Sequence, residues 1–170
     1  MPDIVSDLAM KRKHDVASVK DRLRLLCSRR EYCSSDIYRK ALQALDGDSA
    51  CAAEVLEALK SEKYVDDLRY ACAYSRDKSA ISGWGARKIR FMLSSKGVPQ
   101  DVIDEALLEV DESRADQRFH RLMYGRYMSM KDDPQVRVKL LRYALGRGYR
   151  YDEASSLIDA IIKGNYEDTI

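Results

Sequence analysis

The chain has 170 residues, of which 34% are charged, and its formal net charge is only +2. Its four cysteines contain no CxxC pair and its two histidines lack zinc-ligand spacing, which excludes a disulfide scaffold and a zinc module. No apolar run approaches the roughly 18 residues that span a bilayer, and the N-terminus lacks a signal-peptide pattern. We therefore expect a cytoplasmic protein without metal or other cofactor.

A repeat of about 50 residues organises the chain. Ile37, Ile89 and Leu140 can be laid on one another, and one helical turn later come Ala41, Leu93 and Ala144. Apolar residues spaced by three and four follow in each case, and no segment alternates as a strand does. The sequence therefore predicts an all-α fold of three tandem three-helix repeats packed into an elongated, curved array. Its parts are a flexible basic tail over residues 1–15, repeats over residues 16–64, 65–110 and 111–164, and a C-terminal tail over residues 165–170.

The first repeat predicts three helices. Apolar residues at helical spacing mark a helix over residues 16–30. Ser34 or Ser35 is suited to cap the next helix, because a side-chain oxygen accepts a free amide hydrogen there. Gly47 interrupts the chain before a third helix over residues 49–60.

The second repeat opens at Asp66 and Asp67, which precede a helix that ends near residue 79. Adjacent carboxylates could hold a metal ion, but here they stand where a helix needs an N-terminal cap, and we favour that role. A glycine-flanked turn around Trp84 follows, then a basic helix and a glycine stop. Trp84 either plugs the core, which we favour, or stacks on a base or in a partner's pocket. The residues expected to shape this segment are Gly83, Trp84, Gly85, Ile89, Leu93 and Gly97.

The third repeat predicts a helix over residues 111–130 and a second helix that starts after Pro134. Gly148 stops that helix. A last helix over residues 151–163 ends at Gly164, since glycine readily adopts the left-handed conformation found after helix ends.

Charge is segregated along the chain. Residues 69–96 contain seven basic residues and one acid, whereas residues 101–116 contain seven acids and one basic residue. The short second helix of each repeat carries basic side chains, which favours binding of a polyanion or an acidic partner over simple solvation. The candidate filament- or DNA-binding residues are Arg39, Lys40, Arg87, Lys88, Arg90, Lys96, Arg137, Lys139, Arg142 and Arg147. No phosphate loop or nucleophile elbow is present, so we expect no catalysis.

With these residues in place, the chain resembles the bacterial RecX family, small regulators of the RecA recombinase. The match rests on four blocks in order over residues 16–163, of which the second-repeat turn and helix are the most specific. The blocks are Arg29-Arg30-Glu31-Tyr32 with Ser34 and Ile37; Tyr64-Val65-Asp66-Asp67 with Arg69-Tyr70-Ala71; Gly83-Trp84-Gly85 with Arg87, Ile89, Leu93, Lys96 and Gly97; and Arg147-Gly148-Tyr149 with Tyr151 and Ala154. The chain departs from the family at a displaced stop near Gly47, at an insertion over residues 46–50 and at Ala144.

The resemblance implies a role in recombination, DNA repair and the SOS response. Members bind the RecA–single-stranded DNA filament in its groove and suppress ATP hydrolysis, strand exchange and coprotease activity. They also bind DNA directly, single-stranded and in some cases double-stranded. We expect a monomer that follows this pattern. Two alternatives stay open: a helical-repeat DNA-binding protein that acts without RecA, and a protein-binding scaffold that uses its acidic stretch.

Overall fold

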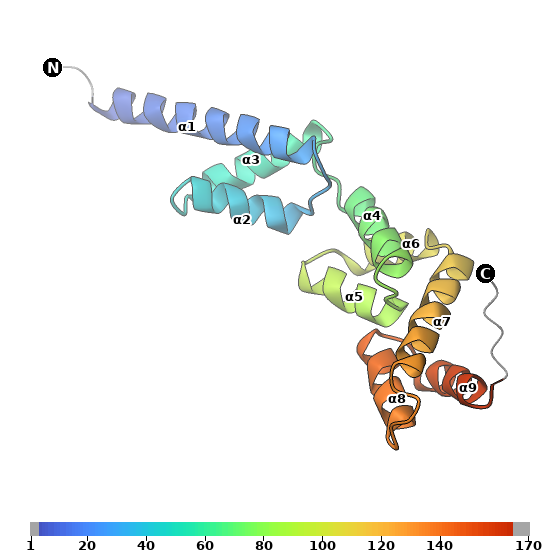
Figure 1. Cartoon of the computed structure of the whole chain (residues 1–170). Coiled ribbons are helices and arrows are strands. Elements are labelled where there is room, and N and C mark those ends of the chain that lie inside the picture. Colours follow the sequence, from blue (N-terminus) through green and yellow to red (C-terminus); the bar gives the residue numbers. More distant parts are fainter. Residues whose placement is uncertain (1–3, 165–170) are drawn as a thin grey trace.

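The computed structural model describes residues 4–164, with side chains from Val16 onward. Within these residues the chain forms nine α-helices and no strand, so the all-α prediction is confirmed (Figure 1). The helices are α1 (Ile4–Cys27), α2 (Ser34–Ala44), α3 (Ser49–Ser61), α4 (Asp67–Ala80), α5 (Ala86–Ser95), α6 (Gln100–Leu108), α7 (Glu112–Met128), α8 (Val136–Gly146) and α9 (Tyr151–Ile162).

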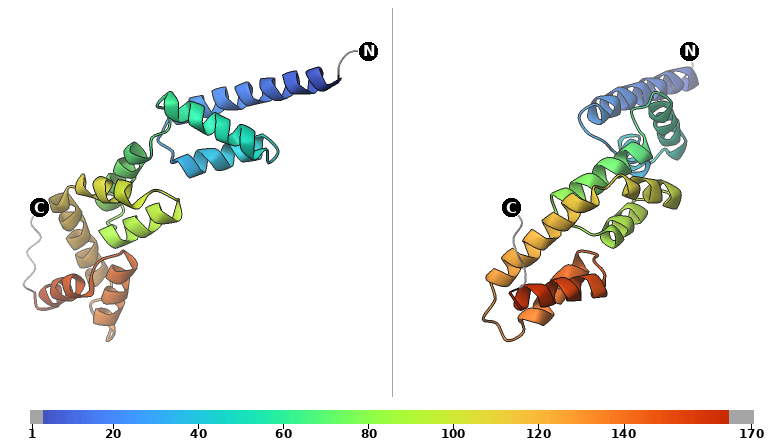
Figure 2. Two further views of the ribbon diagram at one scale, coloured as in Figure 1. Left: turned by 180° about the vertical axis from the view of Figure 1, so that it is seen from behind. Right: turned by 90° about the vertical axis from the view of Figure 1, so that its right-hand side faces the viewer.

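The helices pack in three consecutive groups of three. We call α1–α3 the first group, α4–α6 the second and α7–α9 the third; within each group all three helices contact one another. The groups follow one another in an elongated row, and α4 also packs against α7 (Figures 1 and 2). That the groups are equivalent repeats, with the boundaries expected above, stays a prediction.

Each group encloses its own small apolar core. The repeating positions Ile37, Ile89 and Leu140 lie at the centres of the three cores and are at most 1% exposed. Their helices bury the side chain one turn later as well, because positions four apart share a helix face. Full burial of such a side chain contributes about 1.5–3 kcal/mol. The period that predicted the repeat therefore marks the buried face of each second helix.

The first helix is longer than expected. It begins at Ile4, so residues 4–15 are helical where the sequence suggested a flexible tail. Neither glycine nor proline occurs between Ile4 and Cys27, and a helix nucleated by packing at Val19 and Leu23 can propagate toward the N-terminus at little cost. The expected C-terminal tail, residues 165–170, lies outside the described residues.

Asp66 and Asp67 cap two different helices. The Asp66 carboxylate accepts a hydrogen bond from the Arg69 amide at 2.9 Å and so caps α4. The Asp67 carboxylate reaches back to the first group, where it accepts from the amide of Ser34 at 2.7 Å and from its hydroxyl at 2.6 Å. Neither serine caps α2 as expected, since the cap residue is Cys33 and it offers no side-chain hydrogen bond. Asp67 therefore supplies from the second group the cap that α2 lacks.

The second and third groups meet through their backbones. The Gly85 amide donates to the Arg147 carbonyl at 2.8 Å. Gly148 has φ +87°, and a Cβ at this position would collide with the backbone nitrogen of Lys88. A side chain at Gly85 would come within 2.7 Å of the Gly148 carbonyl oxygen. Glycine is therefore required on both sides of this contact.

Replacing Asp67 with alanine should lower the free energy of unfolding by about 0.5–2 kcal/mol. The Ser34 amide at the start of α2 then loses the carboxylate that caps it. Urea denaturation followed by circular dichroism measures this change. Asp101→Ala is the matched control, since Asp101 also lies in the first turn of its helix but is exposed, with no side-chain partner among the described residues. Equal losses in the two variants would show that Asp67 acts only through the helix dipole.

Gly148→Ala should destabilise the protein far more than Gly97→Ala. Both glycines have positive φ, at +87° and +75°, but nothing lies within 4 Å of a Cβ at Gly97. Gly97→Ala should therefore cost only the left-handed conformation, about 1–2 kcal/mol. Gly148→Ala adds the collision with α5, roughly 1–3 kcal/mol more. Thermal unfolding of the two variants gives the comparison, and similar losses would contradict the backbone contact.

Candidate binding surface

Lys96 lies at the junction between the first and second groups. Its Nζ is 2.6 Å from Asp36 Oδ2, and its carbonyl accepts a hydrogen bond from the Ser35 hydroxyl. The Asp36 and Lys96 side chains are only 13% and 29% exposed. Burial would raise the pKa of the Asp36 carboxyl, but hydrogen bonds from Lys96 and Cys33 outweigh burial and hold that pKa below its ordinary value. Lys96 therefore helps to join two groups.

Lys88 and Arg147 lie at the junction between the second and third groups. Lys88 donates from Nζ to the Gly146 carbonyl at 2.9 Å and lies 4.4 Å from the centroid of the Trp84 ring. Arg147 donates to the Ser82 carbonyl, and its guanidinium lies 4.5 Å from the Tyr143 ring centroid. Both cations thus bond to the opposite group.

Four further candidates form ion pairs at the surface of their own group. Exposed pairs of this kind contribute about 0–1 kcal/mol to stability, so the cation can readily exchange its carboxylate partner for an external anion. The pairs are Arg39 with Asp36, Arg90 with Asp104, Arg137 with Asp159, and Lys139 with Asp133.

Arg87 and Arg142 are the most available of the candidates. Both are exposed, and within residues 16–164 neither has an ion pair or hydrogen bond to its side chain. Lys40 is half-buried, with its Nζ 5.7 Å from the centroid of the Tyr32 ring. None of these three cations has an ion pair within residues 16–164, so each can meet a ligand without first breaking one there.

Trp84 packs against α4 but stays half-buried. Its ring meets that of Tyr74 edge to face, with centroids 6.4 Å apart. Gly83 has φ +60°, a left-handed conformation that glycine adopts readily, and this lets the chain turn here. Glycine is also needed because a Cβ at this position would press into the Leu122 side chain. The turn therefore presents Trp84 where it both packs and reaches solvent.

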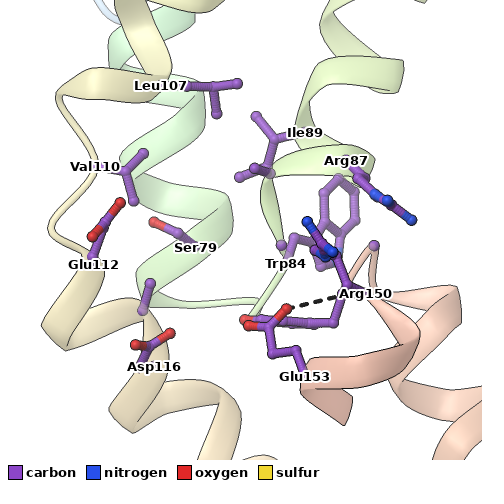
Figure 3. A pocket seen from close by; sticks show the side chains of 15 residues that line it. Ser79, Trp84, Arg87, Ile89, Leu107, Val110, Glu112, Asp116, Arg150 and Glu153 are labelled. Atoms are coloured by element: carbon purple, nitrogen blue, oxygen red, sulfur yellow. Dashed lines mark hydrogen bonds between the residues drawn. The ribbon is translucent and has the colours of Figure 1, made fainter. Parts of the chain in front are cut away.

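A cavity of about 410 Å³ lies between the second and third groups and is lined by residues of both (Figure 3). Glu112 and Asp116 of α7 line one wall, while Trp84 and Arg87 lie across from them. Glu112 follows the α7 cap residue Asp111 just as Asp67 follows Asp66, yet its carboxylate bonds to no described residue. The bond that closes the first junction is therefore missing from the second.

Tyr149 also borders this cavity and stacks on Phe119, with ring centroids 3.4 Å apart. Its hydroxyl is buried without a hydrogen-bond partner among the described residues. Burial raises the pKa of Tyr149, and the nearby carboxylates of Glu153 and Asp116 raise it further. The hydroxyl therefore stays protonated at neutral pH.

A second basic surface, on α7, was not predicted from the sequence. Arg114, Arg118 and Arg121 of α7 line a groove of about 280 Å³ beside Ala80. Their spacing of four and three residues places them on one helix face and was the available signal. It was obscured because Arg114 stands inside the acidic stretch. Arg118 also donates to the Ile81 carbonyl at 3.1 Å, which ties this surface to the second group.

Among residues 4–164, no helix has both the length and the apolar character of a membrane-spanning segment. In the same part of the chain, no cluster of three or more His, Cys, Asp or Glu side chains is placed to bind a metal ion.

The middle of the chain matches a known family model. Residues 66–107 match the model described as RecX, second three-helix domain. A regulatory protein RecX of Clostridium botulinum (strain Eklund 17B / Type B) is 32% identical over 130 residues, which cover 74% of this chain and 58% of that relative. A regulatory protein RecX of Clostridium beijerinckii is 25% identical over 134 residues, covering 76% of this chain and 62% of that relative. The chain thus matches less than two thirds of the length of these relatives.

Two solved structures share the fold. A crystal structure of regulatory protein RecX aligns with 96% of this chain and 79% of its own at a TM-score of 0.71 and 23% identity. The crystal structure of RecX from Lactobacillus salivarius aligns with 89% of this chain and 97% of its own, with a TM-score of 0.70 and 21% identity. At these identities the likeness extends to the fold alone.

Asp36→Asn should destabilise the protein at neutral pH by about 1–3 kcal/mol, because Lys96 loses its anionic partner at a half-buried junction. The folded pKa of Asp36 lies below the ordinary value of about 3.9, so its contribution is fully present above that value. It is lost as the pH falls through the folded pKa. Urea unfolding at pH 7 and at about pH 3 should therefore show a difference from wild type that shrinks in acid.

Asp77→Asn is the control for this measurement, since the Asp77 carboxylate is exposed and has no partner within the described residues. It should match wild type at both pH values. A loss in Asp36→Asn that is the same at both pH values would contradict the role of the ionised carboxylate.

Proposed function

Because this chain belongs to the RecX family, we propose that it regulates a RecA recombinase by binding the RecA–single-stranded DNA filament along its groove. Binding there suppresses ATP hydrolysis, strand exchange and coprotease activity. The protein acts as a ligand of the filament, and its own residues carry out no covalent step.

The observation that carries this proposal is an exposed arginine on the second helix of each group in an elongated row. Arg39 of α2, Arg87 of α5 and Arg142 of α8 are all exposed. A filament offers the same surface again at each subunit, so several weak contacts from one row of groups combine into a strong one. The acidic or phosphate character of the filament surface complements these arginines.

Three of the candidate cations take another role in this proposal. Lys88, Lys96 and Arg147 bond to neighbouring groups, so they fix the angle between groups rather than reach the filament. Arg90, Arg137 and Lys139 add contacts when their exposed ion pairs exchange for filament groups.

The direct test is ATP hydrolysis by preformed RecA–single-stranded DNA filaments during titration with this protein at near-physiological salt. Inhibition at well below one protein per recombinase monomer supports binding in the groove. No inhibition, combined with tight and salt-sensitive binding to DNA alone, supports the alternative of a DNA-binding protein that acts without RecA.

Arg87→Glu combined with Arg142→Glu should raise the protein concentration needed for half-maximal inhibition by roughly tenfold or more, because both contacts become repulsive. Circular dichroism should be unchanged, since neither side chain has a hydrogen bond or ion pair within residues 16–164. Lys131→Glu with Lys163→Glu is the matched control: it changes the net charge equally at exposed positions outside the candidate set. If both double variants lose inhibition to the same extent, net charge and not these arginines governs binding.

A further inference from the structure

Three aromatic rings lie in a row on the second group. The centroids of Tyr70 and Tyr74 are 5.8 Å apart, and those of Tyr74 and Trp84 are 6.4 Å apart. The tyrosines are one turn apart on α4, and Trp84 comes from the turn that follows it. All three are half-buried, so each ring is held by packing on one side and reaches the surface on the other.

A lysine ammonium lies over every ring of this aromatic row. Lys96 Nζ is 5.9 Å from the Tyr70 centroid, and Lys88 Nζ is 4.4 Å from that of Trp84. Lys78 Nζ lies 5.5 Å from Tyr74 and 4.9 Å from Trp84. The lysines come from α4, from α5 and from the residue that caps the end of α5, so the fold brings them together.

A groove of about 440 Å³ runs along the tyrosine end of the row. Arg30, Lys78 and Lys96 line it together with three acids, Glu31, Asp36 and Asp77. Two of these acids are already neutralised, because Glu31 pairs with Arg69 at 2.7 Å and Asp36 pairs with Lys96 at 2.6 Å. Arg30 and Lys78 have no carboxylate partner within residues 16–164, so two unpaired cations face one unpaired acid, Asp77, in this groove.

We propose that the aromatic row Tyr70, Tyr74 and Trp84, with Lys78 over it, binds single-stranded nucleic acid. Unpaired bases stack on the rings, and Lys78 neutralises a phosphate between them. Aromatic platforms in a positive groove bind single strands without sequence preference, because every base has a π-face. Lys78 has no ion pair within residues 16–164, so it can turn from its ring to a phosphate as a base takes its place, while Lys88 and Lys96 keep their bonds between groups. A duplex does not fit, since its bases are already stacked and paired.

This inference rests on the proposed function for its biological setting. Within that function it assigns the DNA contact and the protein contact to different residues. The row contacts the DNA strand, whereas Arg39, Arg87 and Arg142 contact the filament protein. The test below uses DNA without recombinase, so it can fail while the inhibition of filament ATP hydrolysis stands. Equally, inhibition can fail while the row still binds DNA.

The experiment is a titration of the full chain with an oligothymidylate of about 12 nucleotides at low salt. Trp84 is the only tryptophan, so its fluorescence reports directly on the row. We expect quenching that saturates with the oligonucleotide. An abasic oligomer of the same length, which has phosphates but no bases, should bind at least tenfold more weakly and leave the fluorescence almost unchanged.

Tyr70→Leu combined with Tyr74→Leu should weaken binding of the oligothymidylate at least tenfold, measured by anisotropy of a labelled strand. Tyr151→Leu is the matched control, since Tyr151 is 59% exposed, lies on α9 and belongs to neither the row nor its groove. It should bind as wild type does. Lys78→Gln, which breaks no ion pair, should lower affinity and reduce its dependence on salt.

Equal binding of the abasic oligomer and the oligothymidylate by the wild type would overturn the proposal, and that comparison needs no variant. So would wild-type affinity in a folded Tyr70→Leu/Tyr74→Leu protein, or the absence of binding at low salt. An acidic peptide that quenches Trp84 as strongly as the oligonucleotide would identify the row as a protein contact instead.

Discussion

Three short helices enclose too little apolar surface to be stable alone, and this constraint shapes the whole molecule. Each core contains only a few fully buried side chains, so neighbouring groups must support one another. Cys33 shows how closely they do: it belongs to the connector of the first group, yet it is fully buried in the core of the second. Burial raises the pKa of its thiol, so it behaves as a small apolar side chain.

The same constraint explains where the strongest polar contacts occur. Asp67 bonds to Ser34 and Lys96 bonds to Asp36, in both cases across the first junction. At the second junction the Gly85 amide bonds to the Arg147 carbonyl. Polar groups that join helices across a junction fix its geometry, because each hydrogen bond is satisfied at one docking angle only. Apolar cores alone would allow the groups to slide.

Local periodicity was enough to predict the helices and the buried positions, apart from the part of α1 that precedes residue 16. Ile37, Ile89 and Leu140 could be identified from sequence because the face of a helix depends only on spacing. The partners of Asp67, Lys88 and Lys96 could not, since they lie far along the chain and meet only when groups dock. A charged side chain in a sequence is therefore ambiguous between a ligand contact and an internal bond. The aromatic row was not predicted because helical spacing does not show that the turn after α4 brings Trp84 beside Tyr74, although the one-turn spacing of Tyr70 and Tyr74 was visible.

The two junctions differ in the kind of group that accepts most of their hydrogen bonds. Side-chain carboxylates of Asp67 and Asp36 accept at the first junction, whereas backbone carbonyls of Arg147, Gly146 and Ser82 accept at the second. A backbone carbonyl is present whatever residue occupies its position, so substitution of such an acceptor removes a bond at the first junction but not at the second. The first junction can therefore be altered one bond at a time by sequence change, while the second depends on its two glycines.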